Sequence, residues 1–167
     1  SFETIDIGNG SIKLFGSLCQ ANGQKTSAIK TLRSDIGIIF QQFNLVGRLT
    51  LLMNVLVGRL GRVGRLQGTF GVFPKNDRIK ALQALERVGI VDKAYQRAST
   101  LSGGQQQRAA IARTLTQEAK LILADEPIAS LDPGSADKVM KTLRKINEQD
   151  KVTVIVSLHQ IEHAFKH

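Results

Sequence analysis

Residues 101–108 read LSGGQQQR, and residues 121–127 read LILADEP. In the first stretch, Ser102 and Gln105 have the spacing of a capping box, which predicts a helix from here through Leu115. Gly103 and Gly104 leave backbone N–H groups bare at the positive end of this helix, which suits an anion such as a terminal phosphate. The second stretch is a short apolar run typical of a buried strand.

Two carboxylates, Asp125 and Glu126, directly follow that predicted strand. Because successive residues of a strand alternate, their side chains should point in opposite directions. One carboxylate could then hold Mg²⁺, usually through water, while the other polarises an attacking water as general base. Paired acids alone are a weak signal. Their place about twenty residues after a glycine-rich helix start, and before Ser130-Leu131-Asp132, makes the signal strong.

The surrounding sequence predicts a parallel sheet covered by helices. Buried-strand runs occur at 36–40, 121–124 and 152–156, and one helix face between the last two carries Val139, Met140, Leu143 and Ile146. This βαβ pattern brings the carboxyl ends of the strands to one edge, where ligands bind. Gln41, Asp125, Glu126 and His159 would converge there. Any one of them alone is most simply a turn residue.

Two further elements are expected outside this sheet. Residues 10–16 alternate like a half-exposed strand. A helix after Asp77 would place Ile79, Leu82, Leu85 and Val88 on one face and end at Gly89.

Composition narrows the class of protein. The 167 residues suit one globular unit, and 23 Lys and Arg against 14 Asp and Glu give a net charge of +9. Aromatic content is 5% without Trp, so the charge is a poor argument for nucleic-acid binding. A single cysteine, Cys19, the lack of a secretion-type start and the lack of a long apolar run favour a cytoplasmic chain that does not cross a membrane.

Five ordered motifs resemble those of ABC ATPases. They are 40–41 (FQ), 101–108, 121–127, 130–132 (SLD) and 157–159 (SLH). The resemblance implies an α/β fold with a RecA-like P-loop NTPase core, an antiparallel β subdomain and an inserted helical subdomain. It also implies three blocks: 1–43 with the Q-loop strand, 44–117 with the signature motif, and 118–167 with the Walker B, D-loop and H-loop core.

The resemblance assigns a role to each matching residue. Gln41 would sense Mg²⁺ and water, Asp125 would support Mg²⁺, Glu126 would be the catalytic base, and His159 would contact the γ-phosphate. Two domains would sandwich ATP head to tail. The residues Ser102, Gly103, Gly104 and Gln105 would contact the γ-phosphate bound to the opposite subunit, and Asp132 would bridge the subunits.

Structural alternatives accompany these roles. Asp132 before Pro133 is a good helix N-cap, and Gln41 could be a plain loop residue. His159, His163 and His167 recur every fourth residue and could instead form a metal site, although no zinc-type motif lies nearby.

No phosphate-binding loop of the form G-x-x-x-x-G-K-[ST] occurs in these 167 residues. The nearest imitation, Gln24-Lys25-Thr26, lacks both glycines. In the family that loop lies shortly upstream of the position matching Phe2. We therefore expect a chain truncated at its start and short at its end, which would be inactive towards ATP and prone to aggregation by itself.

Within the family, the phrases Pro127-Ile128-Ala129-Ser130-Leu131-Asp132-Pro133 and Leu158-His159-Gln160 most resemble phosphonate import ATPases. The implied partners are a second copy, transmembrane permease subunits and, indirectly, a periplasmic binding protein, at the cytoplasmic face of a bacterial inner membrane. We expect residues 45–57 with Arg48, Arg59, Arg62 and Arg65 to receive the permease. Alternatives are an importer of polar amino acids or other small solutes, a non-catalytic fragment, and an ABC ATPase of DNA repair or translation.

Overall fold

The computed structural model describes residues 10–62 and 73–158. It contains two compact units, residues 1–34 and residues 35–167, and each is described by itself. The predicted division into three blocks at residues 43 and 117 stays a prediction.

The first unit is a small antiparallel sheet followed by a short helix. Strands β1 (Ile12–Leu14), β2 (Ser17–Ala21) and β3 (Gln24–Lys25) pair in chain order, and α1 (Ala28–Leu32) follows. The expected strand at 10–16 is confirmed only for β1, because Phe15 and Gly16 have positive φ and form the turn to β2. Asn22 and Gly23 repeat this geometry, which is the tight hairpin turn that such residues favour.

The second unit is built on three parallel strands. After the 3-10 turn η2 (Arg33–Asp35), β4 (Ile36–Ile39) pairs with β5 (Leu121–Asp125), which pairs with β6 (Thr153–Ser157). All three predicted strands and their parallel direction are confirmed. Ile38, Leu123 and Ile155 share one register row across the sheet.

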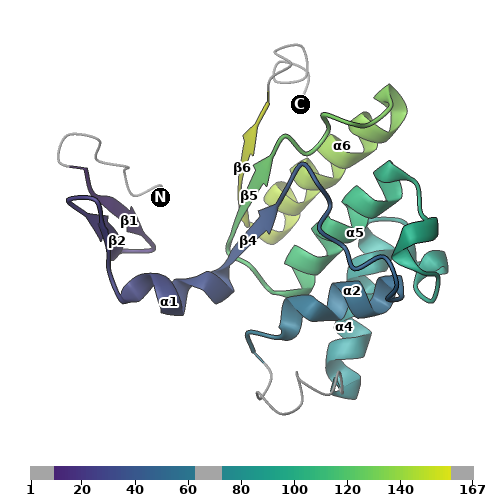
Figure 1. The fold of residues 1–167 in the computed structure, drawn as a ribbon, viewed down its shortest axis with the longest axis horizontal. Helices are drawn as coiled ribbons and strands as arrows, with labels where there is room; N and C mark the ends of the chain where they lie inside the picture. Colours follow the sequence, from purple (N-terminus) through teal and green to yellow (C-terminus); the bar gives the residue numbers. More distant parts are fainter. Residues whose placement is uncertain (1–9, 63–72, 159–167) are drawn as a thin grey trace. The chain divides into compact units, whose positions relative to one another are not determined.

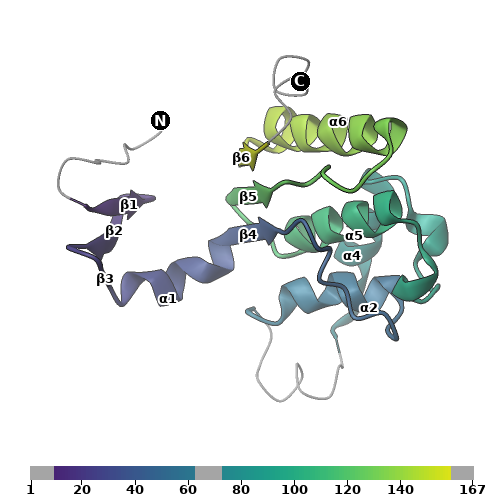
Figure 2. The same ribbon diagram turned by 45° about the horizontal axis from the view of Figure 1, so that its top comes forward.

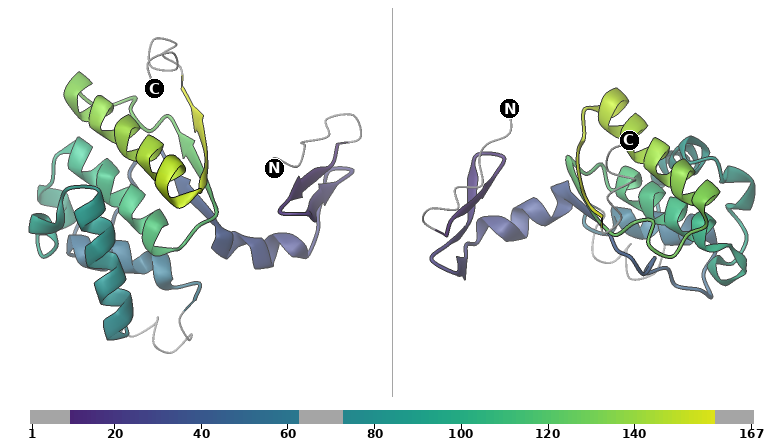
Figure 3. Two further views of the ribbon diagram at one scale, coloured as in Figure 1. Left: turned by 180° about the vertical axis from the view of Figure 1, so that it is seen from behind. Right: turned by 90° about the horizontal axis from the view of Figure 1, so that it is seen from above.

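Helices cover one face of this sheet. Both α5 (Gly103–Thr116) and α6 (Pro133–Asp150) lie on the same side of the strands (Figures 1 and 3). The side chains of Ile39, Ile122 and Ala124 on that side are buried in the core, together with the predicted α6 face. On the opposite face Ile38 is 43% exposed and Ile155 is 45% exposed. The described part of the chain therefore leaves an apolar sheet face open.

A helical cluster packs against the other side of α5. It contains α2 (Leu51–Leu56), the 3-10 turn η3 (Val57–Arg59) and α4 (Lys75–Arg87), followed by the 3-10 turns η4 (Val91–Lys93) and η5 (Ala98–Thr100) (Figure 2). No helix within residues 10–62 and 73–158 is long and apolar enough to cross a membrane.

Helix α4 corrects one detail of the sequence prediction. The helix and its stop at Gly89 (φ +69°) are confirmed, but Ile79 is exposed rather than on the buried face. Leu85 and Val88 are buried as predicted, Leu82 is partly buried, and Ala81 and Ala84 complete the buried face. Small alanines let α4 lie close to its neighbours, and the apolar pattern alone did not distinguish that face.

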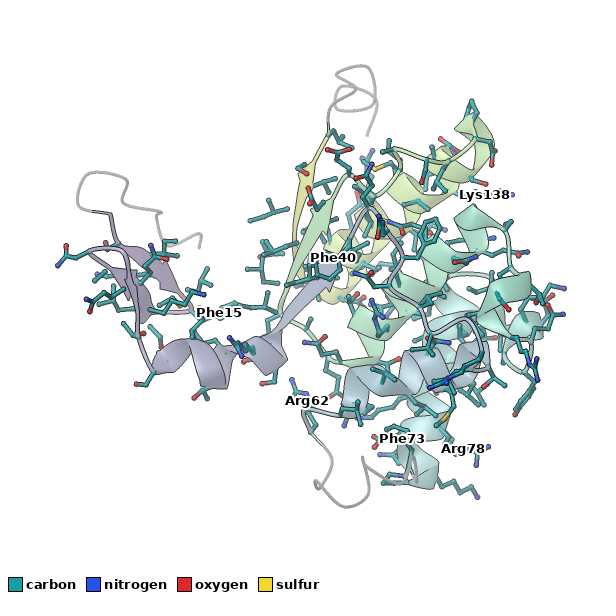
Figure 4. All side chains as sticks on the ribbon, in the orientation of Figure 1. Phe15, Phe40, Arg62, Phe73, Arg78 and Lys138 are labelled. Carbon is teal, nitrogen blue, oxygen red and sulfur yellow. The ribbon has the colours of Figure 1, made fainter. Side chains whose placement is uncertain are left out.

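Arg59 is a structural residue, so the prediction that it lines a docking groove is wrong. Arg59 is 9% exposed as a residue. Its guanidinium pairs with Asp77 and Glu118, each at 2.9 Å, and donates to the Thr116 carbonyl at 3.2 Å. Arg62, labelled in Figure 4, is likewise engaged, with Asp35 at 3.1 Å and the Gln117 carbonyl at 2.9 Å. Arg65 lies outside the described residues. Lys80 also pairs with Glu118. We call Arg59, Asp77, Lys80 and Glu118 the ionic cluster.

The ionic cluster predicts a pH dependence of stability. Hydrogen bonds from Lys80 and Arg59 lower the pKa of Glu118 from 4.5 to about 2. A lowered folded-state pKa contributes stability above pH 4.5 that is lost as the pH falls towards 2. Glu118→Gln should therefore narrow the difference in the free energy of unfolding between pH 6 and pH 3, measured by urea denaturation, by at most about 1 kcal/mol because the side chain is partly exposed.

The matched control is Glu148→Gln, which removes the exposed partner of Arg144 on α6. We expect a smaller change, about 0.3–0.5 kcal/mol, for this helix pair. Equal pH profiles for wild type and Glu118→Gln would contradict the assignment.

Candidate functional site

The carboxyl end of β5 carries Asp125, whose side chain is exposed and held by a neighbour. The Ser157 hydroxyl, level with it on β6, donates to Asp125 Oδ1 at 2.7 Å. Ser157 belongs to the motif at 157–159, in which the family resemblance assigns a role only to His159. The available signal was a hydroxyl at the end of the strand predicted to adjoin that of Asp125.

Glu126 lies beyond the strand in an unusual backbone conformation. The strand ends at Asp125, and Glu126 has φ +45°, so the expected side-chain alternation does not apply to it. Its N–H donates to the Ser157 carbonyl at 3.2 Å, and its carbonyl accepts from Ala129 N–H at 3.2 Å. A left-handed glutamate is disfavoured, and such residues persist where surrounding contacts hold them, often at functional sites.

Gln41 follows the adjacent strand at the same edge of the sheet. Because Ile39 is level with Ala124, Phe40 and Gln41 leave the sheet beside Asp125 and Glu126 (Figure 4 labels Phe40). Gln41 is exposed. The structure thus brings together three of the four residues expected at this edge.

The fourth expected residue, His159, lies outside the described residues, as do His163 and His167. The site at this edge of the sheet is therefore described by Gln41, Asp125 and Glu126, with Ser157 added by the structure. Among residues 10–62 and 73–158 no group of three or more His, Cys, Asp or Glu side chains is placed to hold a metal ion.

The loop after Gln41 is fixed by two residues that sequence reasoning missed. Asn54 on α2 is buried, accepts from Val46 N–H at 2.7 Å and donates to the Val46 carbonyl at 3.1 Å. Arg113 on α5 donates to the Asn44 carbonyl at 2.8 Å. An asparagine within the apolar run of residues 51–57 was the one sequence signal for this contact.

The predicted capping box at the start of α5 is confirmed. Ser102 N–H donates to Gln105 Oε1 at 2.9 Å, and Gln105 N–H donates to Ser102 Oγ at 3.4 Å. The N–H groups in the first turn of a helix have no intrahelical acceptor, so this turn keeps donors for an anion.

The two glycines of this turn differ in their surroundings. A Cβ on Gly103 would meet Leu131 and Phe43 at 3.4 Å, an ordinary contact. A Cβ on Gly104 would lie 2.6 Å from Ser135 Oγ on α6. Gly104 is buried, so the close packing of α5 on α6 is by itself a reason for glycine there.

Asp132 is confirmed as the N-cap of α6. Its carboxylate accepts from Ser135 N–H at 2.9 Å, and Pro133 follows in the first turn. Hydrogen bonds from Ser135 lower the pKa of the exposed Asp132 carboxyl.

The chemistry of the sheet edge fits a hydrated magnesium ion bound with a phosphate. Mg²⁺ keeps several waters and takes one or two carboxylates, the rest of its ligands coming from phosphate oxygens. Asp125 offers an exposed carboxylate with one oxygen already oriented by Ser157. Gln41 adds an amide oxygen at the same edge, and Glu126 a second carboxylate.

The packing at Gly104 predicts a steric penalty. Gly104→Ala should destabilise the chain by about 1–3 kcal/mol in urea unfolding, because the added methyl overpacks the contact with Ser135. Gly103→Ala is the matched control and should be nearly neutral, since its nearest neighbours lie at 3.4 Å. Ser135→Gly should recover part of the loss in Gly104→Ala. Equal effects of the two alanine variants would refute this packing argument.

Sequence comparison places this geometry among known proteins. Residues 5–129 match the family described as "ABC transporter". The chain is 54% identical over 165 residues to a phosphonates import ATP-binding protein of Caulobacter vibrioides, covering 99% of this chain and 62% of the relative. It is 58% identical over 158 residues to the protein of that name in Stutzerimonas stutzeri, covering 95% of this chain and 57% of the relative. The chain therefore spans about three fifths of the length of these relatives.

A solved structure supports the same placement. The dimeric ATP-binding cassette in a post-hydrolysis state, bound to ADP and Pi, is 34% identical, with a TM-score of 0.67. The match covers 93% of this chain and 65% of that chain. With the parallel sheet, the confirmed capping box and the acidic strand end, these findings show that the chain belongs to the ABC transporter family and has its ATPase cassette fold.

Proposed function

We propose that this chain is part of the ATP-hydrolysing subunit of a bacterial ABC importer, with phosphonates as the transported substrate. The observation that carries the catalytic part is the edge formed by Gln41, Asp125 and Glu126, which lie at or just beyond the carboxyl ends of β4 and β5, two strands joined in register. The names of the relatives in Caulobacter vibrioides and Stutzerimonas stutzeri support the substrate.

The acidic edge divides into two roles. Asp125, whose oxygen is oriented by Ser157, supports Mg²⁺ through water. Glu126, which lies beyond the strand in a left-handed backbone conformation, accepts a proton from the attacking water as general base. Gln41, which follows the neighbouring strand, would hold the metal and the attacking water. His159 contacts the γ-phosphate in this proposal. Bound Mg²⁺ would neutralise charge developing on the phosphate oxygens.

The first turn of α5 and Asp132 act in contact with a second copy of the chain. Ser102, Gly103, Gly104 and Gln105 present helix-start donors to the γ-phosphate held by the opposite subunit. The dimeric, ADP-bound cassette with the same fold supports this arrangement. The homodimer would bind the permease subunits peripherally at the cytoplasmic face of the inner membrane, with the periplasmic binding protein engaged only through the permease.

Other assignments have less support. Importers of polar amino acids share the loop after Gln41 in general form, and only the names of the relatives favour phosphonates over them. A DNA-repair ATPase would carry a long coiled-coil insertion between Gln41 and Ser102. We propose no nucleic-acid partner.

Removal of the proposed base should separate binding from turnover. In a version of the chain extended to the length of its curated relatives, Glu126→Gln should retain ATP binding and lower ATP turnover by ~10²-fold or more. Glu86→Gln, which removes the same charge from the exposed side of α4, should leave turnover unchanged. Near-normal turnover in Glu126→Gln would show that another group is the base.

The permease would dock on an exposed surface beside α2. Backbone contacts bring residues 94–97 alongside 49–52, with Leu51 N–H donating to the Gln96 carbonyl at 2.8 Å. Tyr95 is 71% exposed there, and Val46 and Arg48 are exposed on the loop after β4. Exposed aromatic, aliphatic and arginine side chains are the usual core of a protein interface. We call Val46, Arg48 and Tyr95 the docking surface.

Charge reversal tests the docking surface. Arg48→Glu in the extended protein should weaken recruitment to permease-containing membranes by ~10-fold, with the ATP turnover of the soluble protein unchanged. Lys145→Glu makes the same charge change on exposed α6 and should recruit normally. Co-sedimentation measures both. Equal recruitment of the two variants would mean that Arg48 is simply a solvated side chain.

A further inference from the structure

Gln107 in α5 is fully buried without a hydrogen-bond partner. Its side chain is 0% exposed, and neither Nε2 nor Oε1 has a partner within the described part of the chain. Buried amides in folded proteins are nearly always paired, because an unpaired one loses its bonds to water and gains none. An apolar side chain of the same length would suit this position better in the structure as it stands.

The position of Gln107 shows what the amide is close to. Residues three and four apart share a helix face, so Gln107 lies on the face of Gly103 and Gly104. Helical side chains lean towards the N-terminus, and Gln107 therefore covers the turn of the two glycines, which have no side chains of their own. That turn contacts Phe43, Leu131 and Ser135. The amide is thus placed where α5 meets the loop after β5.

The loop at 126–132 has backbone groups to offer in return. Within it, Ala129 N–H donates to the Glu126 carbonyl and Leu131 N–H donates to the Ile128 carbonyl. For the N–H groups of Ile128 and Ser130 no acceptor occurs among the described residues. An amide side chain supplies both a donor and an acceptor. A small shift of this loop could therefore pair the Gln107 amide with one of these unpaired backbone N–H groups, which would satisfy both the amide and the loop.

We propose that Gln107 is a positioning residue for the loop at 126–132. Its amide takes up a backbone hydrogen bond of this loop in the nucleotide-bound state, and the state described here lacks that bond. The loop begins with the proposed base Glu126 and ends at Asp132, so the contact favours the working arrangement of both. The inference rests on the proposed function, because nucleotide binding is what shifts the loop.

Gln107→Met tests this role, since methionine is unbranched and close in size but has no amide. In the chain extended to the length of its relatives, the thermal midpoint without nucleotide should rise by roughly 2–4 °C, because the unpaired amide is gone. ATP turnover should fall by ~10-fold or more at saturating ATP, with little change in KM. Gln149→Met, at an exposed position of α6, should change neither quantity.

The combination of a higher midpoint and slower turnover is specific to this inference. A midpoint that falls or stays the same means that the amide already has a partner, such as a buried water, and overturns the proposal. A higher midpoint with normal turnover means that Gln107 only fills space, and overturns it too. The unsubstituted extended protein is measured alongside. If it does not hydrolyse ATP, the proposed function is refuted and this inference with it, and this outcome differs from a loss of turnover in Gln107→Met alone.

Discussion

Close approach to helix α5 is the constraint on which the second unit depends. Three glycines make that approach possible: Gly37 on β4, Gly58 in η3 and Gly104 in α5 itself. A Cβ on Gly37 would lie 2.8 Å from Thr114 Cβ, and one on Gly58 would collide with the Arg113 carbonyl. The sheet, the helical cluster and α6 therefore all pack directly against α5. A change in the position of α5 would alter the packing of each of them.

The two ends of α5 consequently hold different parts of the molecule. Its first turn, with the capping box, lies against Phe43 and Leu131, which belong to the loops that follow β4 and β5. Its last turn is fixed by Arg59, which bonds the Thr116 carbonyl and pairs with Asp77 and Glu118. Burying an arginine carries a desolvation penalty, which the two carboxylates and the helix-terminal carbonyl offset here.

Sequence patterns predicted the elements whose physics is local. The three strands, the α6 face, the capping box at Ser102 and the N-cap at Asp132 depend on spacing along the chain, and all four are confirmed, although one face of the strands predicted to be buried is exposed. Burial of a charge is not local. Arg59 resembles a solvated arginine in sequence, because its partners lie 18 and 59 positions away. The left-handed Glu126 and the unpaired Gln107 likewise arise from tertiary packing, which no propensity of glutamate or glutamine indicates.

The open face of the sheet and the acidic edge belong to the same side of the molecule. Strand residues two apart share a face, so Asp125 continues the face of Leu123, and Ser157 continues that of Ile155. Helices α5 and α6 occupy the other side. A phosphate or metal held by Asp125 would therefore lie beyond the apolar row of Ile38, Leu123 and Ile155, where low polarity strengthens the interaction of a carboxylate with a cation once water is excluded. In the proposed site the apolar face would then contribute to the electrostatics.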